Sequence, residues 1–359
     1  TALSAYVGPK VSRYMEDLKN MLADLGIGSS LHIMQASGGA MTVDSVQGRA
    51  IRTILSGPAG GVLGALKVGE TVGESDFVSF DMGGTSTDVS LVKDGQFQIV
   101  EETKETGYHL RMPMMDIVTI GAGGGSIARV DTGGVLKVGP ESAGADPGPA
   151  CYGVGDEATV TDANVVLGYI DPEFFLGGEM RLDGKRAHDV VQRKVADLIG
   201  MSVEQAAAGI VRIANANMIR AIKRISIERG HDVRDFSLIP FGGAGGLHAG
   251  HLMEELGMRH AIVPIYPGVL SACGLVEADL EYQHVQSILR RLDDVDESTL
   301  QGYFGQLEAR CKKEMADADI QEDTLQFNRA ASLRYRKQVR EVAIDLVESE
   351  RTLFFRQCF

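Results

Sequence analysis

The segment FDMGGTSTDVSL, residues 80–91, constrains the fold of this chain more than any other stretch. Apolar, strand-like runs precede and follow it, and between them lie two glycines and a cluster of hydroxyl side chains. The pattern predicts two antiparallel strands joined by a glycine-tipped bend, because glycine adopts the tight backbone that a bend needs. Such a bend is either a plain β-hairpin or a hairpin that binds phosphate.

The residue types at this bend suit a triphosphate. Backbone N–H groups bind phosphate best where no side chain covers them, which Gly83 and Gly84 allow. Asp81 and Asp88 can face phosphates only through a cation, so they predict Mg²⁺ held largely through water. Further neutral donors would come from the hydroxyls of Thr85, Ser86 and Thr87.

A second glycine loop supports the nucleotide interpretation. The segment PFGGAGGLHA, residues 240–249, places glycines after an apolar strand and before a helix. A flat adenine or ribose can approach such a backbone, and a helix N-terminus attracts phosphate. Two glycine sites separated by a long helix are typical of the actin, sugar kinase and chaperone ATPase class. We therefore expect ATP, with its adenosine part near Gly242, Gly243, Gly245 and Gly246.

Composition limits the partners of the chain. Lysine plus arginine number 35 against 49 acidic residues, and the net charge of −14 argues against a nucleic-acid surface. The chain has no apolar run of 18 residues, so we expect no membrane span and a cytoplasmic location. Its four cysteines are far apart in sequence, which argues against a disulfide framework or a zinc site. They are Cys151, Cys273, Cys311 and Cys358.

Hydrophobic periodicity predicts an α/β fold in a chain of 359 residues. Residues 203–229 form the strongest predicted helix, with Ser202 and Gln205 as a capping box and Gly230 as the stop. Asp94-Gly95 predicts a tight hairpin turn. The other expected helices are 9–25 after Pro9, 56–69 with Ser56 as N-cap and a closely packed face, 246–257, 268–278 and 297–316. The other expected strands lie at 31–35, in three antiparallel segments within 77–101, at 237–241, at 260–264 and near 331–346.

Several polar residues outside the two glycine loops are candidates for other sites. His248, His251 and Glu255 have spacings that could hold a metal, although His248 facing a cleft is the simpler interpretation. Cys151 could be a nucleophile, but a structural role is favoured because no base is placed to activate it.

The segment GAGGGS, residues 121–126, has the wrong spacing for a dinucleotide fingerprint. Asp162 precedes an apolar run and is expected to be a helix N-cap before any other role. Met112, Met114 and Met115 are expected to pack. Other residues that could bind substrate or a metal are Arg111 and Asp146. The substrate-binding candidates are His109, Asp116, Gly123, Gly124 and His248.

Six ordered motifs together resemble the hydantoinase A and ATP-dependent 5-oxoprolinase family, which includes subunits of acetone and acetophenone carboxylases. The resemblance covers about residues 1–285. The motifs are SGPAGGVLGA, FDMGGTSTDVSL, TIGAGGGSIARVD, VGPESAGADPGPACYG, TVTDANVVLGYI and PFGGAGGLHA.

The resemblance implies an actin-like ATPase fold of ribonuclease H-like type, with a mixed sheet and flanking helices. It also implies that ATP phosphorylates a carbonyl oxygen, commonly of a cyclic amide or lactam, so that water can open the ring. Asp81 and Asp88 would be the catalytic and Mg²⁺-binding residues, and a hydantoinase B-type subunit or a fused equivalent would be the partner. A homo-oligomer is also possible. The alternatives are an ATP-dependent ketone carboxylase subunit and a non-catalytic actin-like switch or scaffold.

Family members have a longer N-terminal lobe with a first phosphate hairpin, so we expect this chain to be a fragment with little activity alone. Residues 1–70 would be a remnant of the first lobe with the interlobe helix. Residues 71–278 would be the second lobe, with a glycine-rich insertion at about 104–155. Residues 279–359 would be a truncated C-terminal extension.

Overall fold

The computed structural model describes residues 2–28, 30–46, 48–103, 107, 109–318, 320–338 and 341–346. The chain divides into two compact units, residues 1–279 and residues 280–359. The first unit contains both helices and strands, including a mixed sheet, which confirms the predicted α/β class. No helix among the described residues is long and apolar enough to cross a membrane. The actin-like assignment and the three-part division of the chain stay predictions.

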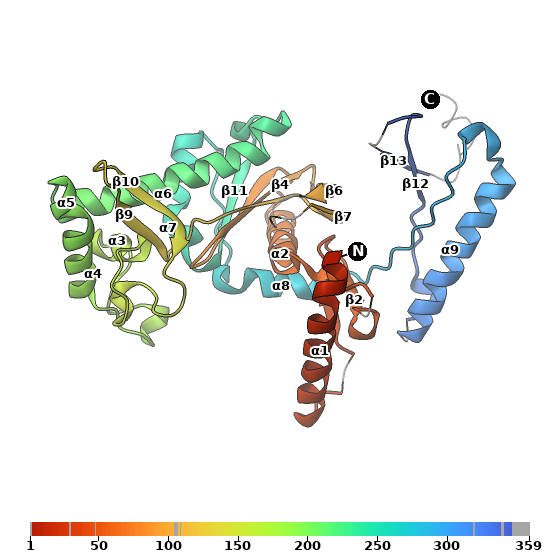
Figure 1. Cartoon of the computed structure of the whole chain (residues 1–359), viewed down its shortest axis with the longest axis horizontal. Coiled ribbons are helices and arrows are strands. Elements are labelled where there is room, and N and C mark those ends of the chain that lie inside the picture. The colour runs from red at the N-terminus through yellow and green to blue at the C-terminus, as the bar shows by residue number, and fades with distance from the viewer. Residues whose placement is uncertain are drawn as a thin grey trace. The chain divides into compact units, whose positions relative to one another are not determined.

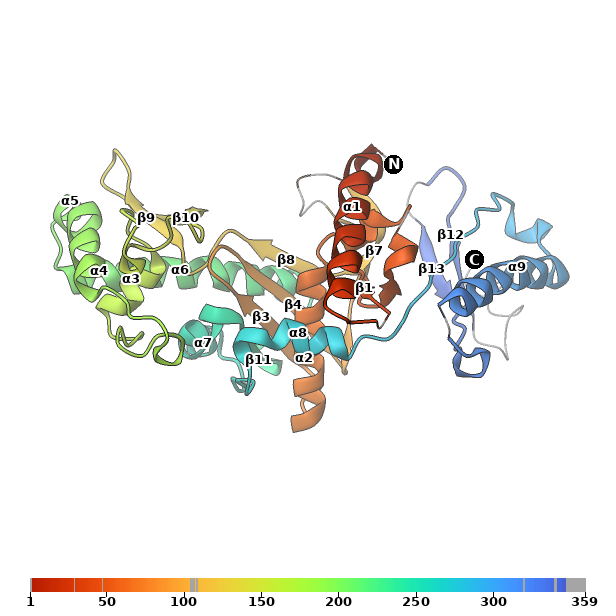
Figure 2. The same ribbon diagram turned by 90° about the horizontal axis from the view of Figure 1, so that it is seen from below.

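A five-stranded mixed sheet organises the first unit (Figures 1 and 2). Its central hairpin pairs β3 (Phe77–Met82) with β4 (Thr87–Lys93) in antiparallel register, as predicted. Strands β5 (Gln96–Phe97) and β8 (Ile117–Ile120) both pair with β4. Strand β11 (Ser237–Phe241) lies parallel to β3 on the other side. Residues far apart in sequence therefore meet at the end of the sheet where β3 and β11 stop.

The predicted hairpin turn lies between β4 and β5. Both Asp94 and Gly95 have positive φ, 52° and 71°, as a tight hairpin turn of this type requires. The strand predicted at 96–101 is instead two strands, β5 and β6 (Ile99–Thr103). β6 leaves the main sheet and pairs with β7 (Leu110–Met115).

Helices α2 (Ser56–Val72) and α8 (Leu270–Val276) pack backbone to backbone, as the glycines of α2 predicted. A Cβ on Gly274 would collide with the carbonyl oxygen of Gly60 and lie 2.5 Å from the nitrogen of Gly64. The predicted N-cap is wrong, because Ser56 is already helical and Leu55 is the N-cap, with a φ of 59°. The short 3₁₀ turn η8 (Pro267–Val269) precedes α8.

The N-terminal segment contains a long helix and a small hairpin. Helix α1 (Ala2–Asp24) begins before Pro9, which corrects the predicted start. Proline removes one intrahelical hydrogen bond, but its fixed φ is compatible with a helix, so the helix continues through it. Strands β1 (His32–Met34) and β2 (Ala40–Thr42) pair beyond it, followed by η1 (Val43–Val46) and η2 (Ala50–Thr53).

The glycine-rich insertion is more regular than the predicted loops. Strands β9 (Ser126–Val130) and β10 (Leu136–Ser142) form an antiparallel hairpin. They are followed by a group of helices and turns, and Figures 1 and 2 show its helices α3, α4 and α5 near this hairpin. Its members are η3 (Ala150–Tyr152), α3 (Val160–Val166), η4 (Leu176–Gly178), α4 (Gly184–Val191), the π-helical turn η5 (Gln192–Ala196) and α5 (Asp197–Ile199).

Helix α6 (Val203–Ile225) crosses the whole lobe and carries much of the core. Its predicted capping box is present, since the Ser202 side chain accepts from Gln205 N and the Gln205 side chain accepts from Ser202 N. The helix ends four residues earlier than predicted, and η6 (Ile227–Arg229) completes the segment before Gly230, whose φ is 85°. The buried stripe is Val203, Ala207, Ile210, Ala214, Met218, Ala221 and Ile225.

The segment after α6 alternates strand and helix. The turn η7 (Val233–Asp235) leads into β11, and α7 (Gly242–Leu256) begins four residues earlier than predicted, so its first turn includes the glycine loop. The strand predicted at 260–264 is wrong. Only an isolated parallel bridge between Leu238 and Ala261 is present there.

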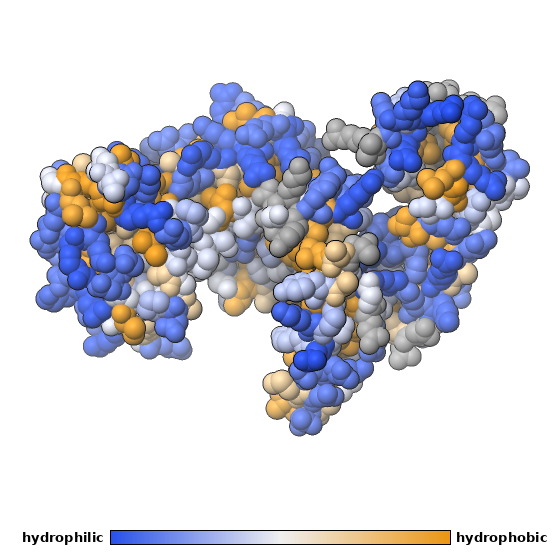
Figure 3. Space-filling view, in the orientation of Figure 1, coloured by the Kyte–Doolittle hydropathy of each residue, from blue (hydrophilic) through white to orange (hydrophobic). Residues whose placement is uncertain are grey.

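The second compact unit contains η9 (Leu292–Asp294), α9 (Glu297–Asp317) and η10 (Glu322–Thr324). Strands β12 (Ala330–Leu333) and β13 (Val342–Asp345) pair antiparallel. The part of the predicted extension at 347–359, including Cys358, lies outside the described residues. On the face shown in Figure 3, hydrophilic residues predominate and the visible hydrophobic residues form separate patches.

Candidate functional site

Two partly buried carboxylates lie opposite each other where β3 and β4 approach the hairpin tip. Asp81 and Asp88 are direct register partners, so their side chains share one face of the sheet. The hydroxyl of Ser271 donates to Asp81 Oδ2 at 3.3 Å, and the hydroxyl of Thr119 donates to Asp88 Oδ1 at 2.5 Å. These hydroxyls orient the two carboxylates from neighbouring elements.

The electrostatics of the pair suit a cation. Burial, and then the nearby charge of Asp88, raise the pKa of Asp81 to about 6, although the Ser271 hydrogen bond opposes them. Burial also raises the pKa of Asp88 above its usual range, against the hydrogen bond from Thr119. A bound cation would offset the cost of ionising these two adjacent carboxylates, whose ionised oxygens are hard donors of the kind that Mg²⁺ binds. The donor set therefore fits Mg²⁺, whose remaining ligands would have to come from water or phosphate.

The raised pKa of Asp81 predicts a pH-dependent stability. In the folded protein the Asp81 carboxyl keeps its proton up to about pH 6, because its pKa is raised to about 6 from the usual 3.8. Ionising Asp81 thus costs folded-state free energy, and stability is lost as pH rises from about 4 through 6. Without Mg²⁺ at pH 8, Asp81→Asn should unfold at a higher denaturant concentration than wild type. Its free energy of unfolding should be larger by on the order of 1 kcal/mol after allowance for solvent screening. The two proteins should converge near pH 4, and equal midpoints at both pH values would contradict this.

The two glycine bends lie side by side. Phe241 is the parallel register partner of Asp81, so α7 begins next to the end of β3. A Cβ on Gly242 would collide with Asp81 Oδ1 and lie 2.5 Å from the carbonyl oxygen of Met82. The φ of Gly242 is also positive, at 79°. Glycine at this position is what lets the second bend touch the first.

A third glycine loop, residues 123–125, braces the hairpin. Gly124 N donates to Gly83 O at 3.0 Å, and Gly125 N donates to Gly84 O at 2.6 Å. A Cβ on Gly123 would lie 2.6 Å from the backbone of Gly84 and Thr85. Gly123 and Gly124, predicted to bind substrate, are both buried: Gly124 holds a hairpin carbonyl, and Gly123 N donates to Ser126 Oγ at 2.8 Å. Their proposed contact with substrate stays a prediction.

Thr87 has a structural role that differs from the predicted phosphate contact. Its side chain is fully buried, and its hydroxyl donates to Ala122 O at 2.5 Å. This bond fixes the start of the brace to β4. Thr85 fits the prediction better, because its side chain is exposed at the hairpin tip.

Some glycines at the site are not explained by the fold. A Cβ on Gly83, Gly84 or Gly243 would meet nothing within 4 Å, and none of these three has positive φ. Among the described residues, the backbone N–H groups of Gly84 and Thr85 have no hydrogen-bond partner. The first turn of α7 also lacks a side-chain cap. Uncovered amides at a bend and at a helix N-terminus form an anion-binding arrangement.

His248 does not face this arrangement, contrary to its predicted place in a cleft. Its side chain is 1% exposed, and its Nδ1 lies 2.6 Å from Asn215 Oδ1 on α6. Burial, and then the charge of His251, lower the pKa of His248 to about 4. His251 and Glu255 are exposed, and no group of three metal-ligating side chains gathers among the described residues.

Two other predicted substrate residues form ion pairs elsewhere. Asp116 pairs with Arg229 at 2.8 Å, which ties the residue before β8 to η6, just beyond α6. His109 is exposed and lies 3.0 Å from Glu102 on β6. Neither is described in contact with the carboxylate pair. Met114 and Met115 are buried, as their predicted packing role requires.

Cys151 and Asp162 belong to one buried structural centre. Burial, and then the charge of Asp162, raise the pKa of the Cys151 thiol well above its usual range, so it is a poor nucleophile at neutral pH. Thr159, and not Asp162 as predicted, is the N-cap of α3, and Asp162 occupies the third helical position of its capping box. Cys151, Cys273 and Cys311 are free thiols.

Four positioning residues were missed by sequence reasoning. Ser271 and Thr119 orient the carboxylates, while Ser126 and Thr161 hold the brace. Thr161 donates to Gly124 O at 2.9 Å through its hydroxyl and at 2.7 Å through its backbone N–H. Ser271 lies 190 residues from Asp81, so no local pattern links them.

Comparison with known proteins identifies relatives over most of the chain. The caprolactamase subunit alpha of Pseudomonas jessenii is 39% identical over 350 residues, which cover 96% of this chain and 50% of that protein. The 5-oxoprolinase 1 of Arabidopsis thaliana is 39% identical over 298 residues, covering 77% of this chain and 23% of that protein. The chain thus spans half or less of the length of these relatives.

Two solved structures share the fold. A nucleotide-free acetone carboxylase, studied for ATP-dependent acetone carboxylation, has a TM-score of 0.81 at 29% identity over 97% of this chain and 50% of its own. The ATP-dependent caprolactamase from Pseudomonas jessenii has a TM-score of 0.77 at 38% identity, covering 97% and 51%. Residues 1–284 match the family described as Hydantoinase/oxoprolinase. The chain therefore belongs to the hydantoinase/oxoprolinase family.

Proposed function

We propose that this chain supplies a phosphate-binding part of an enzyme that uses ATP to phosphorylate the carbonyl oxygen of a cyclic amide. The observation that carries the proposal is the hairpin tip. Gly83 and Gly84 are glycines that neither backbone conformation nor packing requires, and they stand beside a carboxylate pair. A ligand that approaches the backbone closely would explain them, and phosphate is the ligand that such amides favour.

Each part of the site has a role in this proposal. Asp81 and Asp88 would hold Mg²⁺, which would neutralise phosphate charge when bound. The N–H groups of Gly84 and Thr85 would donate to phosphate oxygens, together with the first turn of α7. The open position of Gly243 would leave room for the adenosine part of ATP. The braced hairpin would hold these donors in place, and phosphoryl transfer depends mainly on such positioning.

The proposed reaction has three balanced steps and consumes two waters. The amide carbonyl oxygen attacks the γ-phosphorus, the bond from that phosphorus to the bridging oxygen breaks, and ADP leaves with the electron pair. The product is an imidate-like phosphate ester of the ring. A first water adds to the former carbonyl carbon, and the ring C–N bond breaks, with the nitrogen taking the electron pair and a proton, to give an acyl phosphate. A second water then attacks this acyl carbon, and inorganic phosphate leaves with the electron pair of its C–O bond to give the amino acid.

The names of relatives favour a cyclic amide as substrate. Caprolactamase and 5-oxoprolinase are both named for cyclic amides. The structural likeness to acetone carboxylase supports ketone carboxylation as the second candidate. The caprolactamase relative is named as a subunit, so we propose a second subunit of hydantoinase B type, or a fused equivalent, as partner. An ATP-driven switch without substrate turnover is the third candidate.

Phosphate release from MgATP tests the proposal, using the protein that contains this chain together with its partner subunit. We expect hydantoin, 5-oxoproline or caprolactam to stimulate release at least about tenfold, since an acceptor must be present for transfer. Amino acid formation should match phosphate release in amount. Stimulation by acetone that requires bicarbonate would favour the carboxylase, and release that ignores every acceptor would favour the switch.

A further inference from the structure

A small loop, residues 143–148, stands beside the hairpin tip. Gly148 N donates to Ala143 O at 3.2 Å, which closes the loop at its base. Residues 145–147 are exposed, and Asp146 occupies the turn. No hydrogen bond or ion pair is found for the Asp146 carboxylate within the described part of the chain. A solvated carboxylate at the tip of a fixed loop is available to a ligand.

The base of this loop is attached directly to the phosphate-binding hairpin and its brace. Ala143 N donates to Gly125 O at 2.8 Å. The Ser142 hydroxyl lies 3.4 Å from the Thr85 hydroxyl and accepts from Gly144 N at 3.1 Å. Asp146 is two residues beyond Gly144, so its Cα lies at most roughly 7 Å further along the chain. The loop therefore borders the place where a γ-phosphoryl group would lie.

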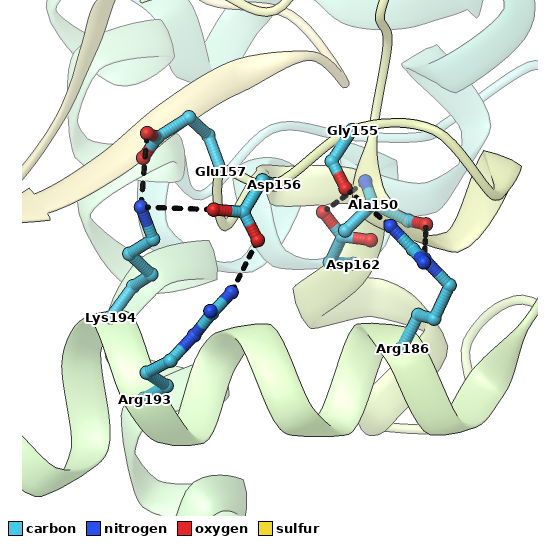
Figure 4. Close-up of polar contacts among 8 residues, drawn as sticks. All are labelled: Ala150, Gly155, Asp156, Glu157, Asp162, Arg186, Arg193 and Lys194. Atoms are coloured by element: carbon cyan, nitrogen blue, oxygen red, sulfur yellow. Dashed lines mark hydrogen bonds and ion pairs between the residues drawn. The ribbon is translucent and has the colours of Figure 1, made fainter.

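The far end of the same segment is fixed by a buried carboxylate (Figure 4). Asp162 is fully buried, and its oxygens accept from Ala150 N at 3.2 Å and from Cys151 N at 2.7 Å. It also accepts from the backbone N–H and the hydroxyl of Thr159, at 3.0 Å and 2.7 Å. Burying a carboxylate costs free energy unless several donors satisfy it, and here four do. The donated bonds hold the turn at residues 150–151 in one position.

The Arg186 side chain holds the carbonyl side of this turn. Arg186 donates to Ala150 O at 3.3 Å and to Gly155 O at 3.0 Å, and Arg193 pairs with Asp156 (Figure 4). Thr161, next to Asp162, bonds Gly124 of the brace. One helical turn thus fixes both the brace and the end of the 142–151 segment. The loop between these fixed points has a defined place relative to the hairpin.

We propose that loop 143–148 forms the acceptor side of the phosphoryl-transfer site and that Asp146 accepts a hydrogen bond from the ring N–H of a cyclic amide. This inference rests on the proposed function and specifies its substrate class. A cyclic amide carries an N–H next to the carbonyl that is phosphorylated, and an ionised carboxylate only accepts hydrogen bonds. A ketone lacks that N–H. Asp146 would therefore favour a cyclic amide over a ketone and orient its carbonyl oxygen toward the hairpin.

Steady-state kinetics of Asp146→Ala in the complete complex test the inference, with caprolactam, 5-oxoproline and hydantoin as acceptors. Losing a charge-assisted hydrogen bond should raise the KM of the acceptor about tenfold or more, while the KM of MgATP changes less than about twofold. Asp146→Asn should lie between the two proteins. Asp156→Ala is the matched control, because Asp156 is an exposed carboxylate outside the 142–151 segment, paired with Arg193. It should leave both KM values unchanged.

The outcomes separate the inference from the proposed function. The inference is supported if Asp146→Ala raises the KM of the acceptor, the KM of MgATP changes little, and Asp156→Ala changes neither value. Cyclic amide turnover in wild type with an unchanged acceptor KM in Asp146→Ala overturns the inference and leaves the proposed function intact. An equal rise in the KM of MgATP would place Asp146 on the nucleotide and also overturn it. If no cyclic amide stimulates the wild type, the proposed function fails and the inference fails with it.

Discussion

Replacing Asp81 with alanine should lower ATP turnover by about a thousandfold or more, because the variant loses half of the carboxylate pair that would hold Mg²⁺. The fold should survive, since Asp81 is only partly buried and its described bond is a single one from Ser271 at 3.3 Å. Removing a carboxylate with a raised pKa also relieves the folded protein of an unfavourable charge at neutral pH. Phosphate release and far-ultraviolet circular dichroism would measure the two effects.

Asp189→Ala provides the matched control for this variant. Asp189 is an exposed carboxylate on α4 that pairs with Lys185, and it is not described in contact with the hairpin. Its replacement should leave turnover within about twofold, since exposed ion pairs contribute little. Turnover at the wild-type rate in Asp81→Ala, with the usual dependence on Mg²⁺, would remove Asp81 from the site.

Replacing Gly242 with alanine should destabilise the protein by about 3 kcal/mol and abolish ATP binding as well. The added Cβ would collide with Asp81 Oδ1 and lie 2.5 Å from Met82 O. The φ of 79° at this position is also unfavourable for any residue with a Cβ. Either the start of α7 or the end of β3 must move, and both belong to the proposed site. Chemical denaturation and calorimetric titration with MgATP would measure these losses.

Alanine substitutions at two other glycines separate the effect of backbone strain from the effect of a lost ligand contact. A Cβ on Gly84 meets nothing within 4 Å, so Gly84→Ala should keep its stability within about 0.5 kcal/mol but bind MgATP at least tenfold more weakly. Gly250 lies later in α7 with open space around it, so Gly250→Ala should gain about 0.5 kcal/mol from better helix propensity and bind normally. Normal MgATP binding in Gly84→Ala would argue against a phosphate at the hairpin tip.

Local features of the fold were predictable where a few neighbouring residues decide them. Asp94-Gly95 supplies the positive φ values of its turn, and Ser202 with Gln205 forms its capping box. The capping box at Thr159 and Asp162 has the same spacing, so the N-cap of α3 could also have been identified correctly. The strand at 260–264 could not, because an apolar run does not reveal whether a neighbouring strand pairs with it along its length.

The amino-acid sequence by itself determined the class of the fold, the glycine-tipped hairpin and the residue types at its ends, because these depend on periodicity and on the conformational range of glycine over short segments. The tertiary structure alone decided which groups meet. It placed Gly242 against Asp81 and brought Ser271 to the same carboxylate. It also turned Thr87 toward Ala122 and buried His248 against Asn215. The physical reason is that a side chain's partners depend on how sheet and helices pack across long stretches of chain, and packing is not encoded in any one segment.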